Sequence, residues 1–261
     1  MNHISKSFTS DDGRIYKSHS WEQREGGYRR CALILGNGLW SVSKETRLVD
    51  FLLDRGFRVL SLESAFGSIE LPRTRLKSFR DAVASFAKET LPEGLPLYLI
   101  ATSFSGSALL PSAAEIRDIA ALALISPVID LSAPKFKVPL FFLPKAELTV
   151  EREYLSGMPE LLSGFLESDT TLKFHKRDLK AAAADISKAL EKGFSFPVAA
   201  FAGESDPYLG EASRLALAKA GAKVFSYPRV RREPGHDRYA DNYYADLGSF
   251  LDEVEAGKSR P

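Results

Sequence analysis

Three residues of the types that perform nucleophilic catalysis stand where apolar segments of this chain end. Ser103, Asp206 and His236 each come shortly after a short apolar run that predicts a buried β-strand. Reactive groups gather beyond the carboxyl ends of the strands in an open parallel sheet, so we expect the three side chains to meet at one edge. In that arrangement the histidine accepts the serine proton, and the carboxylate orients the imidazole and stabilises its cation. The pattern predicts attack by a serine on an acyl carbonyl.

The sequence around Ser103 has the layout of a strand, a tight turn and a helix. An apolar run leads directly to the serine, and an apolar segment of helical character begins directly after it. A turn that holds a serine hydroxyl clear of the sheet needs small residues two positions on either side, and Ala101 and Ser105 meet this need. Ser105 is an alternative nucleophile, but that choice would leave Gly106, which has no side chain, immediately after it.

The identity of the acid is less narrowly defined than that of the base. Asp206 is the first choice and Asp130, which also follows a predicted strand, is the second. Glu204 and Asp237 are near the proposed partners in sequence, but Asp237 adjoins the histidine and cannot easily reach round to its Nδ1. None of the other three histidines follows a strand of the predicted core. His236 is therefore the expected base.

Two backbone N–H groups are expected to stabilise the oxyanion of the reaction. The first belongs to Phe104, which directly follows the proposed nucleophile. The second is expected from Leu39, because Gly36 and Gly38 precede it and permit unusual backbone angles after the first core strand. An ordinary tight turn is the alternative interpretation of the glycine pair.

Strand patterns alternate with helical patterns along most of the chain. This alternation predicts an α/β fold with a mostly parallel sheet and helices on both faces. An Asp-Asp-Gly turn near the start predicts an antiparallel hairpin at the edge of that sheet. The predicted strands span 4–9, 14–21, 30–35, 57–62, 97–100, 119–125, 196–201 and 223–227, and helices are expected after residue 43 and over 75–90, 105–116, 208–220 and about 243–251.

The pattern changes between residues 130 and 193. Pro134, Pro139 and Pro144 break up an apolar stretch that contains the apolar residues of 136–143. Amphipathic segments follow near 151–166 and 177–191, and we find no strand pattern there. The sequence therefore predicts a mainly helical cap insertion over 130–193 within a core formed by 1–129 and 194–261. The apolar residues of 136–143 are expected either to line a pocket or to attach the insertion to the core.

Composition excludes several classes of function. The 261 residues include 35 basic and 34 acidic side chains, which gives a net charge of +1 and no electrostatic case for nucleic acid or an anionic membrane as a partner. The single cysteine, Cys31, lies in an apolar run and is expected to be a buried structural thiol. The polar N-terminus has no signal-peptide core, and no window is apolar enough for a membrane span, so we expect a cytoplasmic protein.

With these motifs in place, nearly the whole chain resembles the α/β-hydrolase superfamily. More narrowly, Leu99-Ile100-Ala101-Thr102-Ser103-Phe104-Ser105 resembles the acyltransferase subunit of the bacterial luminescence fatty-acid reductase, a thioesterase that releases myristate from acyl-carrier protein. That subunit also has Ala and Ser in place of the two elbow glycines. The strand 196–201 leading to Ser205-Asp206, and Gly235-His236-Asp237 after the last strand, are similar as well. The resemblance covers roughly 30–130 and 195–250 and fades in the insertion.

The resemblance implies a serine hydrolase in which Ser103, Asp206 and His236 are nucleophile, acid and base. Its expected substrate is a small-molecule acyl ester or thioester, which includes acyl-CoA and acyl-carrier protein, and it needs no metal or organic cofactor. Asn37 departs from the pattern, since many hydrolases have histidine before the oxyanion glycine. Two other hypotheses are a general carboxylesterase or lipase for oxygen esters and a catalytically silent binding protein of the same fold.

Overall fold

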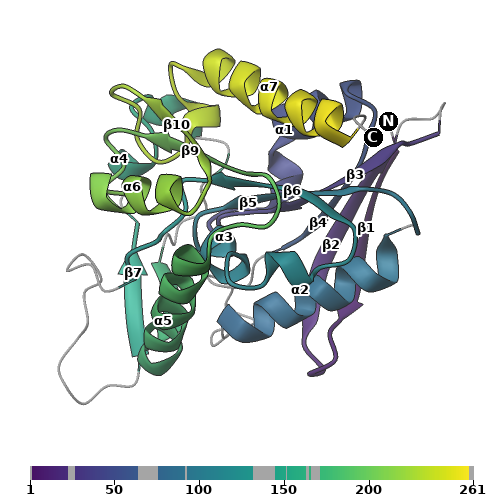
Figure 1. Ribbon diagram of the computed structural model, residues 1–261, viewed down its shortest axis with the longest axis horizontal. Helices are drawn as coiled ribbons and strands as arrows, with labels where there is room; N and C mark the ends of the chain where they lie inside the picture. Colours follow the sequence, from purple (N-terminus) through teal and green to yellow (C-terminus); the bar gives the residue numbers. More distant parts are fainter. Residues whose placement is uncertain are drawn as a thin grey trace.

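A computed structural model describes residues 2–22, 27–63, 76–91, 93–131, 145–150, 152–162, 165 and 171–258 of the chain. Its centre is an eight-stranded sheet in the order β1-β2-β4-β3-β5-β6-β9-β10 (Figure 1). Six strands of this sheet, β4, β3, β5, β6, β9 and β10, pair in parallel, and β1 and β2 form an antiparallel edge. The predicted mostly parallel sheet is confirmed. The strand bounds are β1 Asn2–Thr9, β2 Ile15–Glu22, β3 Arg30–Leu35, β4 Phe57–Leu62, β5 Leu97–Thr102, β6 Ile119–Ile125, β9 Val198–Gly203 and β10 Lys223–Tyr227.

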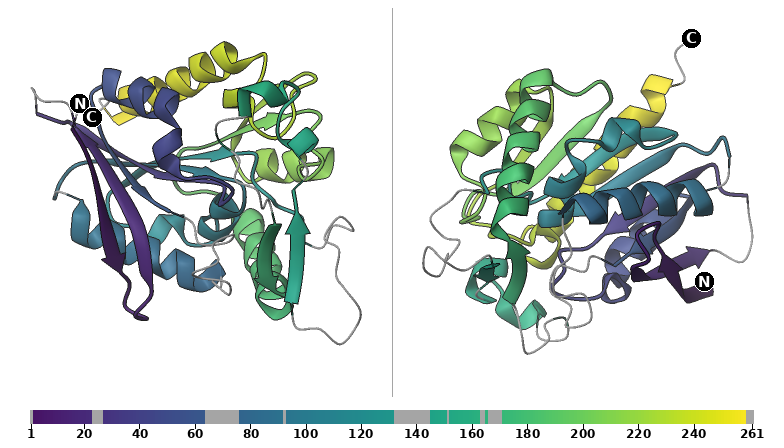
Figure 2. Two further views of the ribbon diagram at one scale, coloured as in Figure 1. Left: turned by 180° about the vertical axis from the view of Figure 1, so that it is seen from behind. Right: turned by 90° about the horizontal axis from the view of Figure 1, so that it is seen from below.

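Helices cover both faces of the sheet, as the alternation of patterns predicts. On one face α1 (Thr46–Asp54) and α7 (Ala240–Lys258) pack against side chains such as Ala32 and Ile34 of β3. On the other face α2 (Leu76–Thr90), α3 (Phe104–Leu109), α5 (Lys176–Lys192) and α6 (Glu211–Lys219) cover Leu33 and its neighbours (Figures 1 and 2). Successive side chains of a strand point to opposite faces, so one buried strand supplies both cores.

The N-terminal hairpin lies at the edge of the sheet, as expected from the Asp-Asp-Gly turn. β1 pairs with β2 over its whole length, and β2 continues onto β4 with Ser18 opposite Leu62. Gly13 in the turn has a φ of 78°. An antiparallel edge can face water on one side, and Ile4 and Ile15 are indeed exposed there.

The expectation that the insertion contains no strand is wrong. β7 (Lys145–Thr149) and β8 (Thr171–His175) pair antiparallel into a second, two-stranded sheet. Buried Leu172 and Phe174 do alternate with other residues, but five residues directly before a helix give a weak strand signal. The helix expected over 177–191 is confirmed as α5. The helical segment near 151–166 is broken into α4 (Arg152–Leu155) and the 3₁₀ turn η3 (Pro159–Leu162), because Pro159 cannot continue an α-helix. The apolar residues of 136–143 lie outside the described residues.

Two further differences concern the ends of helices. α3 ends at Leu109 and not at Ile116, since Pro111 has no N–H to donate to the preceding turn, and the 3₁₀ turn η2 (Ala113–Glu115) follows. Ser41, one of the two expected caps of the first helix, caps the 3₁₀ turn η1 (Val42–Lys44) that precedes α1.

Cys31 is fully buried in β3, as predicted, and burial raises the pKa of its thiol to about 11. Over the part of the chain that the structure describes, no helix is long and apolar enough to cross a membrane.

Candidate active site

Ser103 lies at the turn between β5 and α3 in a conformation that side chains rarely adopt. Its φ is 59° and its ψ is −128°. Such a conformation costs about 1–3 kcal/mol and tends to persist at functional positions, where the surroundings hold it. Ser105, the alternative nucleophile, lies inside α3 and donates its hydroxyl to the Gly36 carbonyl at 2.6 Å. The strained turn therefore distinguishes Ser103 from Ser105.

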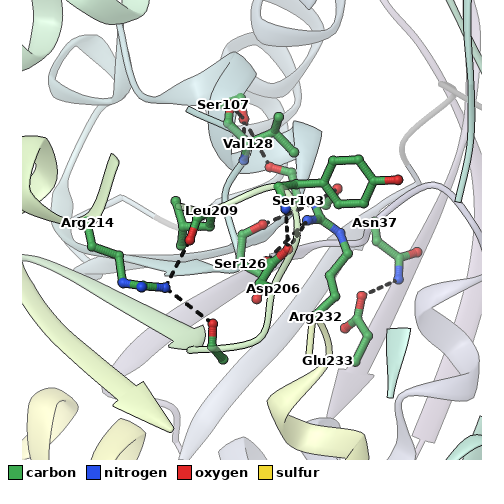
Figure 3. Close-up of polar contacts among 12 residues, drawn as sticks. Asn37, Ser103, Ser107, Ser126, Val128, Asp206, Leu209, Arg214, Arg232 and Glu233 are labelled. Carbon is green, nitrogen blue, oxygen red and sulfur yellow. Dashed lines mark hydrogen bonds and ion pairs between the residues drawn. The ribbon is translucent and has the colours of Figure 1, made fainter. Parts of the chain in front are cut away.

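The Ser103 hydroxyl is bound by a buried arginine (Figure 3). Arg232 Nη2 donates to Ser103 Oγ at 2.7 Å and lies 3.1 Å from the Ser126 carbonyl oxygen. Arg232 Nη1 lies 3.2 and 3.3 Å from the two carboxylate oxygens of Asp206. The guanidinium also stacks over Tyr208, 4.9 Å from the ring centroid. One cation thus joins two of the three residues predicted to form the catalytic triad.

Arg232 reaches this position because its loop crosses the end of β9. A Cβ atom at Gly203 would lie 2.0 Å from the Arg231 carbonyl oxygen and 2.2 Å from that of Val230. Only glycine therefore permits the loop after β10 to pass so close. The Arg232 N–H then donates to the Tyr154 carbonyl of α4 at 3.2 Å, and the Glu233 N–H donates to that of Leu155 at 2.8 Å.

Asp206 has its carboxylate fully engaged away from His236. The Tyr208 N–H donates to Asp206 Oδ1 at 2.8 Å, in addition to the two contacts from Arg232, and the Asp206 side chain is 0% exposed. The other acids considered differ: Asp130 and Glu204 are exposed, while buried Asp237 accepts from the Gly157 N–H at 2.7 Å.

His236, in the 3₁₀ turn η4 (Pro234–His236), pairs with a different carboxylate. Its Nε2 lies 2.8 Å from Glu45 Oε2, at the N-terminus of α1. The ring packs against Phe165 and Trp40 at centroid distances of 4.5 and 5.9 Å. Within the described parts of the chain, His236 has no hydrogen bond to Ser103 or Asp206. The predicted triad is thus not joined in this conformation, and its three roles stay predictions.

The glycine loop after β3 is held from inside by Asn37. Asn37 Oδ1 accepts from the Leu39 N–H at 2.8 Å. Its Nδ2 donates to Glu233 Oε1 at 3.0 Å, as Figure 3 shows. Gly38 has a φ of 83°, so the glycine is needed in this loop. The Leu39 N–H, one of the two expected oxyanion donors, already has a partner here. Phe104 starts α3 beside Ser103, and both donor roles stay predictions.

A small cavity of about 20 Å³, roughly the space of one water molecule, lies beside His236 and the glycine loop. Its lining includes Thr102, Asn37, Glu45, Glu233 and His236. The elbow strand, the glycine loop and the histidine loop therefore border one space. No group of three or more His, Cys, Asp or Glu side chains suited to a metal ion occurs among the residues given above as described.

Glu233 makes the stability of the folded protein depend on pH. Burial, followed by the charge of Glu45, raises the pKa of Glu233 to about 7, although His236, Asn37 and Arg232 act in the opposite direction. An unfolded glutamate has a pKa of about 4.3, so between about pH 4.5 and 7 the folded chain binds more protons. The contribution of this group to stability therefore falls as pH rises through that window.

We expect the substitution Glu233→Gln to stabilise the protein by about 1–3 kcal/mol at pH 8 and by less at pH 5, because glutamine has no buried charge. Urea unfolding at the two pH values measures this. An equal effect at both would contradict the assignment of the penalty to the charge of Glu233.

Sequence reasoning did not find Arg232, Glu45 or Glu233 as residues of the site. Arg232 and Glu233 lie in the same loop as His236, but the loop sequence alone does not show which charged residues point into the site. Glu45 lies 191 positions from His236, so only the fold reveals the pair. One signal was present in the sequence: Gly203 lies just beyond the predicted strand 196–201, and it is the glycine that lets the Arg232 loop pass close to β9.

The fold is shared with solved structures of ester-cleaving enzymes. A lipase in its open form is 16% identical, with a TM-score of 0.74 over 97% of this chain and 99% of that chain. A soluble variant of monoglyceride lipase from Saccharomyces cerevisiae, in complex with a substrate analog, is 16% identical, with a TM-score of 0.72 over 97% and 95%. A carboxyl esterase from Bacillus coagulans is 17% identical, with a TM-score of 0.69 over 97% and 99%.

These likenesses and the strand order show that the chain has the α/β-hydrolase fold, as the sequence predicts. No family model matches the sequence. No curated protein sequence matches it either. The fold alone does not assign an activity, which has to be argued from the site.

Proposed function

We propose that this protein hydrolyses acyl esters or thioesters through an acyl-serine intermediate on Ser103. The observation that carries the proposal is the positive φ of Ser103 at the turn between β5 and α3. A strained strand-to-helix turn presents a serine hydroxyl at the carboxyl edge of an α/β-hydrolase sheet. The solved lipases and esterases of the same fold support the reaction class.

In the proposed reaction Ser103 Oγ attacks the acyl carbonyl while His236 takes its proton. The Oγ–carbonyl bond forms, and collapse of the tetrahedral intermediate expels the alcohol or thiol, which takes the proton back from His236. Water then attacks the acyl-serine carbonyl with His236 again as base. The bond between the acyl carbon and Ser103 Oγ breaks, the carboxylic acid leaves, and Oγ takes the proton back from His236. His236 has to approach Ser103 for the transfer, and catalytic hydrogen bonds are often long before substrate binds.

Arg232 and Phe104 supply positive charge and a donor in this mechanism. The cationic guanidinium favours negative charge on Ser103 Oγ at 2.7 Å. When Oγ becomes an ester oxygen it accepts hydrogen bonds less well, and the Nη2 proton is free to turn to the developing oxyanion. The Phe104 N–H is the second donor. Leu39 contributes its N–H only if the bond to Asn37 opens.

The leaving group is proposed from the sequence resemblance. The similarity to the acyltransferase subunit of the luminescence fatty-acid reductase favours a fatty-acyl thioester, such as acyl-CoA or acyl-carrier protein, over an oxygen ester. Two assays decide this: p-nitrophenyl esters and acyl-CoAs of the same chain length, compared by kcat/KM. A ratio that favours the thioester supports the narrower proposal, and hydrolysis of oxygen esters alone leaves a general carboxylesterase or lipase.

A fluorophosphonate probe tests the reaction class directly. We expect covalent labelling of the wild-type protein, with the labelled peptide containing Ser103, because the probe reacts only with an activated serine hydroxyl. Mass spectrometry of the digest locates the adduct, and Ser105→Ala is the matched control, which should still be labelled. An adduct on Ser105, or none at all, would contradict the assignment.

A catalytically silent binding protein is the second candidate, and one observation favours it. In the described conformation both Ser103 and Asp206 are bound to Arg232 and not to His236. Absence of labelling together with saturable binding of a fatty acid would establish this alternative.

A further inference from the structure

We infer that Glu45, and not Asp206, is the carboxylate that positions His236 for proton transfer. This inference rests on the proposed function, in which His236 is the base. It assigns a positioning role to a residue at the N-terminus of α1, far in sequence from the other residues of the site.

The first step of the argument concerns Asp206, which lacks a free side for the imidazole. Its two carboxylate oxygens face Arg232 Nη1 at 3.2 and 3.3 Å, and Oδ1 also accepts from the Tyr208 N–H at 2.8 Å. Both members of the ion pair are buried, with side-chain exposures of 2% and 0%. Moving Asp206 to His236 would leave a buried guanidinium without its counter-ion, which is strongly unfavourable.

The second step concerns Glu45, which already holds the imidazole. Its Oε2 lies 2.8 Å from His236 Nε2, and its Oε1 accepts from Trp40 Nε1 at 2.5 Å. The Trp40 ring lies edge-on to the imidazole, and Ser156 Oγ donates to the His236 carbonyl at 2.7 Å. The carboxylate and the ring are therefore each fixed by a second contact. With Nε2 donating to Glu45, Nδ1 is the nitrogen left to accept the Ser103 proton.

The charges around His236 agree with this geometry. Burial lowers the pKa of His236, but the hydrogen bond and charge of Glu45, followed by the charge of Glu233, raise it above the ordinary value overall. Arg47 of α1 acts against them. Tyr243 and Tyr244 of α7 border the same cavity, and burial raises the pKa of both phenols, so they stay neutral.

The test compares Glu45→Gln with Asp206→Asn. We measure the His236 pKa by NMR titration of the imidazole and the pH dependence of kcat/KM for an acyl ester. Removing the charge of Glu45 should lower the His236 pKa. The acid limb of the pH profile, which reports loss of the neutral base, should then move to lower pH while the plateau falls about 10²-fold. Asp206→Asn should leave the His236 pKa unchanged, whatever it does to the plateau.

The side-chain amide introduced by Glu45→Gln can still accept from Trp40, so this variant is expected to fold, and Glu45→Asp should restore part of the shift. If Asp206→Asn does not fold, the pair Arg232→Met and Asp206→Asn, which removes both buried charges, replaces it. A His236 pKa that follows Asp206 and ignores Glu45 overturns the inference. A folded wild-type protein with neither ester nor thioester turnover overturns the proposed function instead, and the NMR titration then still decides which carboxylate binds His236.

Discussion

Replacement of Ser103 by alanine should abolish ester and thioester turnover, with a loss in kcat on the order of 10⁶-fold. The hydroxyl is the proposed attacking group, and none of its neighbours can replace it: the hydroxyl of Ser105 is bound to Gly36 and that of Ser107 to Val128. Steady-state assays of Ser103→Ala and Ser105→Ala measure the difference. Ser105→Ala should retain most of the activity, and a Ser103→Ala variant that keeps its turnover would exclude the nucleophile assignment.

The same position offers an independent readout that needs no substrate. Glycine adopts a positive φ at no steric cost, whereas alanine keeps the strain of the serine. We therefore expect the free energy of unfolding of Ser103→Gly to exceed that of Ser103→Ala by about 1 kcal/mol, as measured by urea unfolding. Equal stabilities would mean that the turn at Ser103 stores no strain.

Replacement of Arg232 by methionine should be the most destabilising single change in the site. It leaves the carboxylate of Asp206 buried with no cation, and breaking a buried ion pair in this way costs about 3–5 kcal/mol. The hydroxyl of Ser103 and the carbonyl of Ser126 lose a donor as well. Urea unfolding at neutral pH measures the loss.

The double variant Arg232→Met with Asp206→Asn is the matched control. Removing both charges leaves no uncompensated ion, so it should recover much of the stability lost in Arg232→Met. A double variant as unstable as the sum of the two single variants would contradict the coupling. Arg232→Lys separates charge from shape, because lysine cannot contact Asp206 and Ser103 together with the planar fork of arginine.

The fold could be predicted from the sequence because the central strands of its sheet are almost completely buried. Runs such as 30–35, 57–62 and 119–125 are mostly apolar, and the strands observed there begin and end at the predicted residues. The insertion was harder, since β7 and β8 have only five residues each and their pairing is set by tertiary contacts. Local pattern does not reveal such short strands.

The sequence predicts which strands the candidate site residues follow, but it does not predict which side chains contact each other. Ser103, Asp206 and His236 do follow β5, β9 and β10, because parallel strands place their carboxyl ends at one edge. Which carboxylate meets which cation depends on side-chain packing. Arg232 lies only four positions from His236, yet the arginine and not the histidine forms the ion pair with Asp206. Spacing along a loop does not decide between two such neighbours.

The backbone contacts between α4 and the loop after β10 affect how this protein could be re-engineered. The backbone N–H groups of Arg232 and Glu233 donate to carbonyls of α4, and the Gly157 N–H donates to the carboxylate of Asp237, the residue after His236. The insertion thus holds in place the loop that carries Arg232, Glu233 and His236. A chimera that exchanges the insertion should retain residues 154–157, because their contacts hold the loop that contains His236, the proposed base.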